Sequence, residues 1–275
     1  LETKEILDKE NIFEPLKESK LLICHVLSSS LEIFLLDYEK EITSLQKKKI
    51  FELTYRRAKG EPSAYLTNSV CFYEDIFYIN SNVLIPRPET EEVIETVLKY
   101  IPNKNLILNV LDIGTGSGVI LSSLLKKLPN SFGVGTDISV EALKVAKKNL
   151  YNLSLINRSK LINSDWCKAI KKNTFDIITC NPPYIDNNHI KNLPKEIKNY
   201  EPLIALKGGK NGLDAFKKLL PLARNVIKEN SLLVLEIGFD QSALIEDILY
   251  KNKFLLKEIT KDLSGNKRVL VAKSF

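Results

Sequence analysis

The stretch Val-Leu-Asp-Ile-Gly-Thr-Gly-Ser-Gly at residues 110–118 carries an apolar strand pattern into a glycine-rich turn, and apolar residues continue from Val119 to Leu128. Glycine lets the backbone turn tightly and approach a ligand closely, because no Cβ atom stands in the way. The spacing is not the G-x-G-x-x-G dinucleotide fingerprint, and the Lys-Ser/Thr pair of a phosphate-binding loop is missing. We therefore predict a strand, a ligand-binding turn and a helix within an α/β sheet.

Acidic residues lie near the ends of three successive predicted strands. Asp112 lies two residues before the first glycine, where a carboxylate can meet a cationic amino group. Asp137 ends the second strand, 19 residues after the glycine turn, a position that suits a bidentate hydrogen bond to ribose hydroxyls. Asp165, after a third strand at 161–162, can accept from an exocyclic amine, with Trp166 packed nearby. Each acid alone could cap a helix or a turn. Together with the glycine turn they predict a site for a nucleoside with an amino-acid tail, S-adenosylmethionine.

A second signature is Asn-Pro-Pro-Tyr at residues 181–184, which follows the buried-strand pattern Phe-Asp-Ile-Ile-Thr-Cys at 175–180. Pro182 and Pro183 cannot extend a strand, because proline lacks an N–H and fixes φ. The chain must leave the sheet there as a stiff turn, at the edge where ligands bind in open α/β sheets. Taken alone, the stretch could be an ordinary strand-ending turn. Beside the glycine turn and the acids, it predicts a catalytic loop.

The carbonyl groups of this loop suit a planar –NH2 group. We expect the Asn181 side-chain oxygen and the Pro182 carbonyl to accept the two N–H bonds of an amide, which directs its nitrogen at a methyl donor. Tyr184 is expected to stack on the amide plane and to help exclude water. No strong general base is required, because the nitrogen becomes far more acidic as the new bond forms. Asn181, Pro182, Pro183 and Tyr184 are thus the catalytic candidates.

The chain divides into three stretches of different periodicity. Apolar residues recur at three- and four-residue steps over 1–66, which predicts a small helical bundle. Aromatic and β-branched residues over 67–88 predict a β-hairpin and a linker that Pro86 and Pro88 stiffen. From 89 to 275 strand and helix patterns alternate, which indicates a doubly wound, Rossmann-like α/β domain.

The last part of the chain adds three strand patterns, at 232–237, 254–259 and 268–272. The last two lie too close together for a helical crossover, so we expect an antiparallel hairpin at the sheet edge. With the four earlier strand patterns, the expected sheet has seven strands.

The chain resembles, over nearly its whole length, the glutamine methyltransferases that modify peptide-chain release factors, the PrmC/HemK family. Besides the two signatures, the resemblance rests on Arg-Arg at 56–57, Gly-Glu-Pro at 60–62, Ile-Pro-Arg-Pro-Glu-Thr-Glu at 85–91, Tyr-Glu-Pro at 200–202, Gly-Gly at 208–209 and Glu-Ile-Gly at 236–238. A glycine expected near Asn68 is missing, but asparagine tolerates a positive φ better than most residues. The resemblance implies a seven-stranded S-adenosylmethionine-dependent methyltransferase domain behind a helical substrate-binding domain and a β-hairpin linker.

The resemblance also implies the site residues. Those implied to hold the cofactor are Asp112, Gly114, Thr115, Gly116, Gly118, Asp137, Ile138, Asp165, Trp166 and Asn181. Those implied to form the substrate pocket are Arg87, Glu89, Thr90 and residues 181–184. For Arg87, Glu89 and Thr90 the alternative interpretation is an ion-paired strap between domains.

The activity implied is transfer of a methyl group to the side-chain amide nitrogen of the glutamine in the Gly-Gly-Gln motif of class 1 release factors. A DNA or RNA adenine or cytosine amino-methyltransferase is an alternative, because flipped bases also present a planar –NH2 group. It would favour a separate target-recognition domain or a strongly basic cleft, and the sequence indicates neither. A non-catalytic scaffold is a third class, but a scaffold has no need of the 181–184 loop.

Composition argues against several other classes. The 275 residues carry a net charge of +6 from lysines spread along the chain, which indicates at most a mildly basic surface. No apolar run approaches the roughly 18 residues of a membrane span, and the Leu-Glu-Thr-Lys start lacks a signal-peptide core. Two histidines and four cysteines without metal-type spacing predict no metal site. The lack of methionine predicts a processed, truncated or reassigned start. We expect a cytoplasmic monomer without a membrane or direct nucleic-acid partner.

Overall fold

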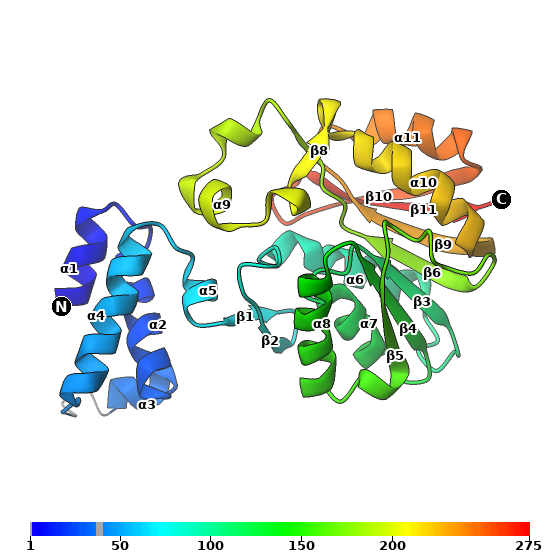
Figure 1. Cartoon of the computed structure of the whole chain (residues 1–275). Coiled ribbons are helices and arrows are strands. Elements are labelled where there is room, and N and C mark those ends of the chain that lie inside the picture. The colour runs from blue at the N-terminus through cyan, green and yellow to red at the C-terminus, as the bar shows by residue number, and fades with distance from the viewer. Residues whose placement is uncertain (1, 37–40) are drawn as a thin grey trace. The chain divides into compact units, whose positions relative to one another are not determined.

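Two compact units make up the chain in the computed structural model, which describes residues 2–36 and 41–275 (Figure 1). One unit comprises Leu1–Ser69 together with Pro194–Tyr200, and the other comprises Val70–Leu193 together with Glu201–Phe275. Residue 1 and residues 37–40, which the sequence assigns to the helical domain, lie outside the described residues.

The first unit is helical, as the apolar periodicity of 1–66 predicts. Its helices are α1 (Glu2–Lys9), α2 (Pro15–Leu27), α3 (Leu31–Leu36), α4 (Ser44–Ala58), α5 (Ser63–Leu66) and α9 (Lys195–Tyr200). Proline at the first position of α2 leaves no N–H in need of a partner. Thr43 caps α4, since its hydroxyl accepts from the Gln46 N–H at 3.2 Å. Buried Leu22, Leu53 and Leu66 pack together beneath these helices.

A buried arginine attaches α9 to this unit. Arg57 is 4% exposed, and its guanidinium donates to Glu18 at 2.7 Å and to Glu196 at 2.9 Å. Glu196 lies in α9, so the ion pair joins segments 139 residues apart in the chain. Sequence patterns placed residues 194–200 in the domain that begins at residue 89. The structure places them in the first unit, a difference that arises because no local pattern shows that Glu196 pairs with Arg57.

A two-stranded sheet opens the second unit. Its strands β1 (Ser69–Phe72) and β2 (Asp75–Tyr78) flank a short turn in which Tyr73 has a φ of 57°. Asn68, which stands near the position of the expected glycine, has a φ of 52°. The asparagine therefore adopts the left-handed conformation that a glycine would have supplied, and the predicted hairpin is present.

A seven-stranded sheet forms the centre of the second unit, in the order β10-β11-β9-β6-β3-β4-β5. Its strands are β3 (Asn109–Ile113), β4 (Phe132–Asp137), β5 (Ser159–Asn163), β6 (Phe175–Cys180), β9 (Ile227–Glu236), β10 (Phe254–Lys261) and β11 (Lys267–Ser274). β11 runs antiparallel to both of its neighbours, whereas β9, β6, β3, β4 and β5 pair in parallel. The predicted seven strands and the antiparallel hairpin at the sheet edge are thus confirmed. The strand order reverses between β3 and β6, which makes a topological switch point.

Helices cover both faces of this sheet (Figure 1). They are α6 (Glu91–Tyr100), α7 (Val119–Lys127), α8 (Val140–Asn152), α10 (Asp214–Val226) and α11 (Ser242–Lys251). Leu124 of α7 packs with Val110 on one face, while Phe216 of α10 and Leu249 of α11 pack with Leu111 on the other. Since neighbouring strand residues point to opposite faces, both faces of the central strands are apolar, as a buried parallel sheet requires.

Short elements complete the second unit. They are η1 (Pro88–Thr90), η2 (Ile156–Arg158), β7 (Ile185–Asp186), η3 (Ile190–Asn192), η4 (Leu203–Ala205), β8 (Lys207–Gly209) and η5 (Lys210–Gly212). β7, directly after residues 181–184, pairs in parallel with β8 apart from the main sheet. Among the helices of the described residues, none has both the length and the apolar character needed to cross a membrane.

Candidate active site

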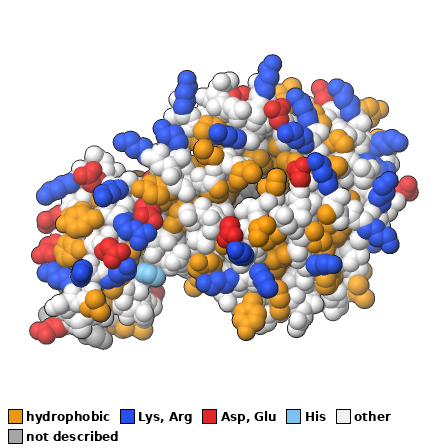
Figure 2. Space-filling view, viewed as in Figure 1, with side chains coloured by type: hydrophobic (Ala, Val, Ile, Leu, Met, Phe, Trp, Pro, Cys, Tyr) orange, Lys and Arg blue, Asp and Glu red, His pale blue; other side chains and the backbone are white. Residues whose placement is uncertain are grey.

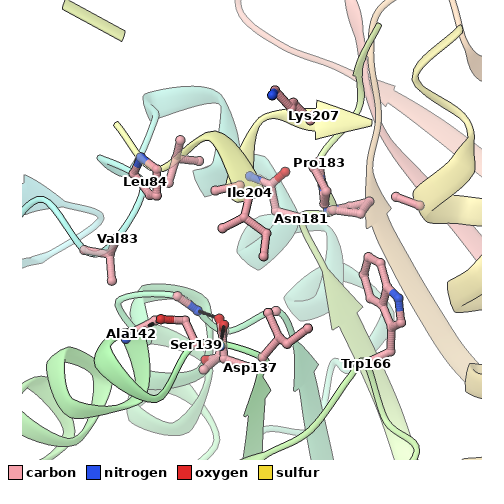
Figure 3. Close-up of a pocket in the computed structure, with 18 of the residues that line it drawn as sticks. Val83, Leu84, Asp137, Ser139, Ala142, Trp166, Asn181, Pro183, Ile204 and Lys207 are labelled. Atoms are coloured by element: carbon pink, nitrogen blue, oxygen red, sulfur yellow. Dashed lines mark hydrogen bonds between the residues drawn. The ribbon is translucent and has the colours of Figure 1, made fainter. Parts of the chain in front are cut away.

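A cavity of about 860 Å³ opens at the carboxyl ends of β3, β4, β5 and β6 (Figure 3). Its wall includes the glycine turn after β3, Asp137 at the end of β4, residues 164–166 after β5 and Asn181 after β6. This volume lies in the ordinary range of small-molecule sites. Open α/β sheets bind ligands at this edge, beside the switch point, so position and size both favour a ligand site.

The glycine turn donates a backbone hydrogen bond to the Asp137 carboxylate. Gly114 and Gly116 have φ values of 71° and 55°, which glycine adopts without strain. The Gly116 N–H donates to Asp137 Oδ2 at 2.9 Å, and the Ser139 N–H donates to Oδ1, also at 2.9 Å. Burial raises the pKa of Asp137, while these donors oppose the rise. Each carboxylate oxygen retains accepting capacity for a ligand, because one N–H occupies only one of its lone pairs.

Asp112 lies beneath the turn and is not among the residues that line the cavity. It is 1% exposed, and its oxygens accept from the Thr115 hydroxyl at 2.7 Å and from the Thr179 hydroxyl at 2.8 Å. Asp112 and Thr179 are partners in the parallel register of β3 and β6, which explains the second contact. Burial raises the pKa of Asp112 to about 6. The carboxylate therefore ties the glycine turn to β6, and the structure does not place it where it would meet a ligand's amino group.

Asp165, Trp166 and Ile138 lie in the cavity wall. The Asp165 side chain is 47% exposed and pairs with Lys168, so it lies on the solvent side. Trp166 has a φ of 57° and packs against the sheet core. Gly118, in contrast, is buried outside the wall, and an added Cβ there would lie 3.1 Å from a side-chain atom of α8. Gly118 thus permits close packing of the turn on α8.

Asn181, Pro182 and Pro183 line the same cavity, and Figure 3 shows Asn181 across from Asp137. Asn181 Nδ2 donates to Thr90 Oγ1 at 3.3 Å. Its Oδ1 accepts no hydrogen bond from any part of the chain that the structure describes. Asn181 therefore presents an acceptor oxygen to the cavity.

Tyr184 turns away from the cavity and is not part of its wall. The ring packs against the sheet core, and the hydroxyl donates to Glu236 Oε1 at 3.0 Å. Burial, together with the Glu236 charge, raises the pKa of the Tyr184 hydroxyl, so that the hydroxyl keeps its proton and donates. The structure thus differs from the expected stacking over an amide plane, because the hydroxyl bonds to a buried carboxylate instead.

Distant segments hold the 181–184 loop in place. An added Cβ at Gly208 would lie 2.7 Å from Tyr184 Cα and 2.8 Å from the Pro183 carbonyl oxygen, so only glycine permits this approach of β8. Gln241 Nε2 donates to the Tyr184 carbonyl at 2.9 Å, and Gln241 Oε1 accepts from the Gly238 N–H at 2.9 Å. These contacts give the Gly-Gly and Glu-Ile-Gly stretches a role in supporting the loop.

Arg87 and Thr90 line the cavity, whereas Glu89 is exposed outside it. Arg87 donates to Glu201 Oε1 at 2.5 Å, and the Ile85 N–H donates to Glu201 Oε2 at 3.2 Å. The Glu201 side chain is 1% exposed. Both partners of this ion pair belong to the second unit, so Arg87 forms a strap within that unit.

Several wall residues were not among the predicted site residues. Val83 and Leu84 of the linker, Ala142 of α8, Ile204 and Lys207 all line the cavity, and Figure 3 shows them around Asn181 and Asp137. Val83, Leu84 and Ile204 are apolar, like most cavity walls, so their chemistry marks no site. Their nearness in sequence to the Ile-Pro-Arg-Pro and Tyr-Glu-Pro stretches was the one available signal.

Charges of both signs are mixed on the surface, and the described residues hold no metal-ligating cluster. On the face in Figure 2, lysine and arginine side chains are scattered among acidic and apolar ones. Over residues 2–36 and 41–275, no group of three or more His, Cys, Asp or Glu side chains could hold a metal ion. The cavity instead offers oxygen acceptors, backbone N–H groups and apolar walls.

These groups fit S-adenosylmethionine. The Asp137 carboxylate suits a ribose diol, as an acid at the end of the second strand does in nucleotide folds. Ile138 and Trp166 offer apolar surface for a purine ring, and Asp165 beside them can accept from an exocyclic amine. Asn181 lies across from this wall and lines the same space, as do Pro182 and Pro183 of the same loop.

Comparisons with known proteins show which family the chain resembles. Residues 2–67 match the PrmC N-terminal domain, and residues 93–199 match the methyltransferase small domain. The chain is 34% identical to the release factor glutamine methyltransferase of Caulobacter vibrioides, over 98% of this chain and 92% of that protein. It is 33% identical to the bifunctional methyltransferase of Rickettsia conorii, over 96% of this chain and 55% of that protein. The chain thus spans about half the length of such bifunctional relatives.

The fold also matches a solved structure. A methyltransferase from Pyrococcus furiosus superposes with a TM-score of 0.53 and 20% identity, over 72% of this chain and 87% of that one. At this identity, the likeness shows the fold alone.

Proposed function

The chain belongs to the release factor glutamine methyltransferase family, and on that premise we propose that it transfers a methyl group from S-adenosylmethionine to the side-chain amide nitrogen of a release-factor glutamine. The glutamine would be the one in the Gly-Gly-Gln motif of class 1 release factors. One observation carries the proposal. Asn181, whose Oδ1 has no partner among the described residues, lines the same cavity as the glycine turn and Asp137, so that an amide side chain and a cofactor wall share one space.

On the cofactor wall, Asp137 would hold the ribose hydroxyls, and Ile138, Trp166 and Asp165 would enclose the adenine. The glycine turn would lie against the remaining part of the cofactor. When bound, S-adenosylmethionine supplies an electrophilic methyl group. Asp112 would act from beneath, because its bonds to Thr115 and Thr179 fix the turn and β6 relative to each other.

On the opposite wall, Asn181 Oδ1 and the Pro182 carbonyl would each accept one N–H of the glutamine amide. An amide nitrogen is a weak nucleophile, because its lone pair is delocalised into its carbonyl. Two acceptors fix the –NH2 group, direct its lone pair and stabilise the positive charge that develops on nitrogen. The nitrogen would form a bond to the methyl carbon as the sulfur–methyl bond breaks, which leaves a neutral thioether. The nitrogen becomes acidic as this bond forms, so it would release one proton to water without a strong base.

The helical unit would bind the release factor. Its match to the PrmC N-terminal domain supports this role, and so does its apolar surface, where Phe13 is 82% exposed and Leu45 is 77% exposed. Exposed apolar side chains of this size favour a protein partner. We place the activity in the cytoplasm, where release factors act on the ribosome.

A methyl-transfer assay tests the proposal. Purified protein and S-adenosylmethionine with a labelled methyl group are incubated with unmodified release factor, with a Gln→Ala variant of its Gly-Gly-Gln loop, and with unmethylated duplex DNA. We expect label on the unmodified release factor alone. Equal label on the Gln→Ala variant would indicate another protein site, and label on DNA would favour a nucleic-acid amino-methyltransferase.

A further inference from the structure

Glu236 is a buried carboxylate beside the loop at residues 181–184 that the proposed chemistry leaves without a role. It ends β9, next to β6 in the sheet, and it is 1% exposed. Its Oε2 accepts from the Thr90 hydroxyl at 2.6 Å, and its Oε1 accepts from the Tyr184 hydroxyl at 3.0 Å. It is not part of the cavity wall. Any effect of Glu236 on substrate must therefore pass through these two hydroxyl groups.

The direction of each hydrogen bond follows from a count of protons. Hydroxyl groups of Thr90 and Tyr184 both donate to Glu236, which is the arrangement of an ionised carboxylate, so the single hydroxyl proton of Thr90 is committed to Glu236 Oε2. Thr90 Oγ1 can then only accept from its other neighbour, Asn181. The Asn181 side chain must present Nδ2, its donor atom, to Thr90, as the 3.3 Å contact has it. The planar amide consequently places Oδ1 on its other side, toward the cavity.

The same carboxylate holds the far end of the loop. The Tyr184 hydroxyl is its second donor, so one buried group fixes the first and the last residue of 181–184. Leaving a buried carboxylate without donors is costly, which makes this arrangement resistant to rearrangement. Burial raises the pKa of Glu236, and the Thr90 and Tyr184 donors together with the Arg268 charge oppose that rise.

We propose that Glu236 is a positioning residue that, acting through Thr90, orients the Asn181 amide with its oxygen toward the substrate. The inference rests on the proposed function, since it assigns Oδ1 as the acceptor for the glutamine –NH2 group. If Thr90 became the donor toward Asn181, the Asn181 amide would turn over. Its –NH2 group would then face the –NH2 group of the substrate, and two donors do not bond.

Four variants test the proposal: Thr90→Val, Thr90→Ser, Glu236→Gln and the control Thr96→Val. Valine keeps the shape of threonine but removes the hydroxyl, and serine restores it. A glutamine side chain at position 236 carries donor hydrogens. It can donate to Thr90 Oγ1, and the Thr90 hydroxyl can then donate to Asn181 instead of accepting from it. Thr96 is also buried, yet it lies in α6 outside the cavity wall, so Thr96→Val measures the general effect of losing a buried hydroxyl.

We expect Thr90→Val and Glu236→Gln to lower kcat on release factor by roughly 10- to 100-fold, the range for a misplaced reacting group. Thr90→Ser should recover most of that loss, and Thr96→Val should stay near wild type. Cofactor affinity by calorimetry should change less than about twofold in all four, because the Asp137 wall is untouched. A kcat of Thr90→Val equal to that of Thr96→Val would overturn the proposal.

A readout without substrate separates this inference from the proposed function. The side-chain –NH2 signals of Asn181 in a two-dimensional NMR spectrum are identified by their loss in Asn181→Asp. We expect slow hydrogen exchange of the Nδ2 proton in wild type and Thr90→Ser, and fast exchange in Thr90→Val. Fast exchange already in wild type would refute the orientation through Thr90. If wild type labels no release factor but shows the protected signal, the proposed substrate is wrong while the orientation stands.

Discussion

The hydrogen bonds that form the two walls of the cavity join residues at different separations in the sequence. On the cofactor wall, Asp137 accepts from N–H groups 2 and 21 residues away, within one strand–turn–helix region. On the substrate wall, Asn181 bonds to Thr90 across 91 residues, and Thr90 bonds to Glu236 across 146 residues. Local backbone groups shape the first wall, and side chains that the fold brings together shape the second.

This difference indicates on which wall a single substitution should have the larger effect. A backbone N–H remains when a side chain is replaced, so the cofactor wall depends on few removable groups. The substrate wall depends on hydroxyl, amide and carboxylate groups that one substitution deletes. We therefore expect larger effects on the substrate wall, and the following four tests run from the largest expected effect to the smallest.

Replacing Asn181 by alanine should have the largest effect. Asn181→Ala removes the acceptor that would stabilise the charged transition state, and loss of one such group typically costs about 10²- to 10³-fold in kcat. Cofactor affinity should stay near wild type, because Asp137 and the glycine turn are unchanged. Single-turnover methyl transfer and calorimetry measure the two quantities. Asn192→Ala, an exposed asparagine in η3, is the control. Near-normal turnover of Asn181→Ala would remove the docking role.

Breaking the Arg87–Glu201 pair tests whether side chains hold the substrate wall. Arg87→Ala leaves the buried Glu201 carboxylate without its cation, which should lower the free energy of unfolding by about 2–4 kcal/mol. Arg56→Ala breaks the more exposed pair with Glu61 and should cost at most about 1 kcal/mol. Denaturant unfolding measures both. Adding Glu201→Gln to Arg87→Ala should recover part of the loss, and equal losses in the two single variants would contradict the argument.

Asp112 joins the two walls. Its protonation should change the free energy of unfolding as the pH changes. Burial raises its folded-state pKa to about 6 from the ordinary value of 3.8. The unfolded chain therefore gives up this proton at lower pH than the folded chain, so stability falls as pH rises from about 4 to about 6. We expect the free energy of unfolding to fall by about 1–3 kcal/mol over this pH range because of Asp112. Asp112→Asn should flatten the unfolding free energy over this window, and parallel curves for the two proteins would contradict the assignment.

The smallest expected difference is between two acids of the cofactor wall, Asp137 and Asp165. Asp137→Ala should weaken S-adenosylmethionine binding by about 1–3 kcal/mol, the cost of a lost buried hydrogen-bonding partner. Asp165→Ala should cost at most about 1 kcal/mol, because this side chain is half exposed and paired with Lys168. Calorimetry on both variants settles the order. A larger loss for Asp165→Ala would reverse the roles of the two acids.

Much of the fold followed from patterns of short range. The seven strands, the edge hairpin and the helical first unit each depend on periodicity or on the distance between neighbouring elements. The glycine turn, Asp137 and Asp165 were predicted from the residues themselves, because the carboxyl ends of neighbouring parallel strands meet at one edge of the sheet. The left-handed φ of Asn68 also agreed with expectation, because that backbone conformation is a local property.

The departures have a common physical origin. Asp112 and Tyr184 both point into the protein, where buried partners satisfy their polar atoms, and no pattern in one segment identifies partners in another. Residues 194–200 joined the helical unit for the same reason, through Arg57 and Glu196.

The sequence by itself determined the family, the α/β class and the order of the elements, since glycine turns, prolines and apolar periods act on the chain within a few residues. Only the tertiary structure decided which way Asn181, Tyr184 and Asp112 face. Each of these side chains has more than one possible hydrogen-bond partner, and burial favours the arrangement in which buried polar atoms find partners from distant segments.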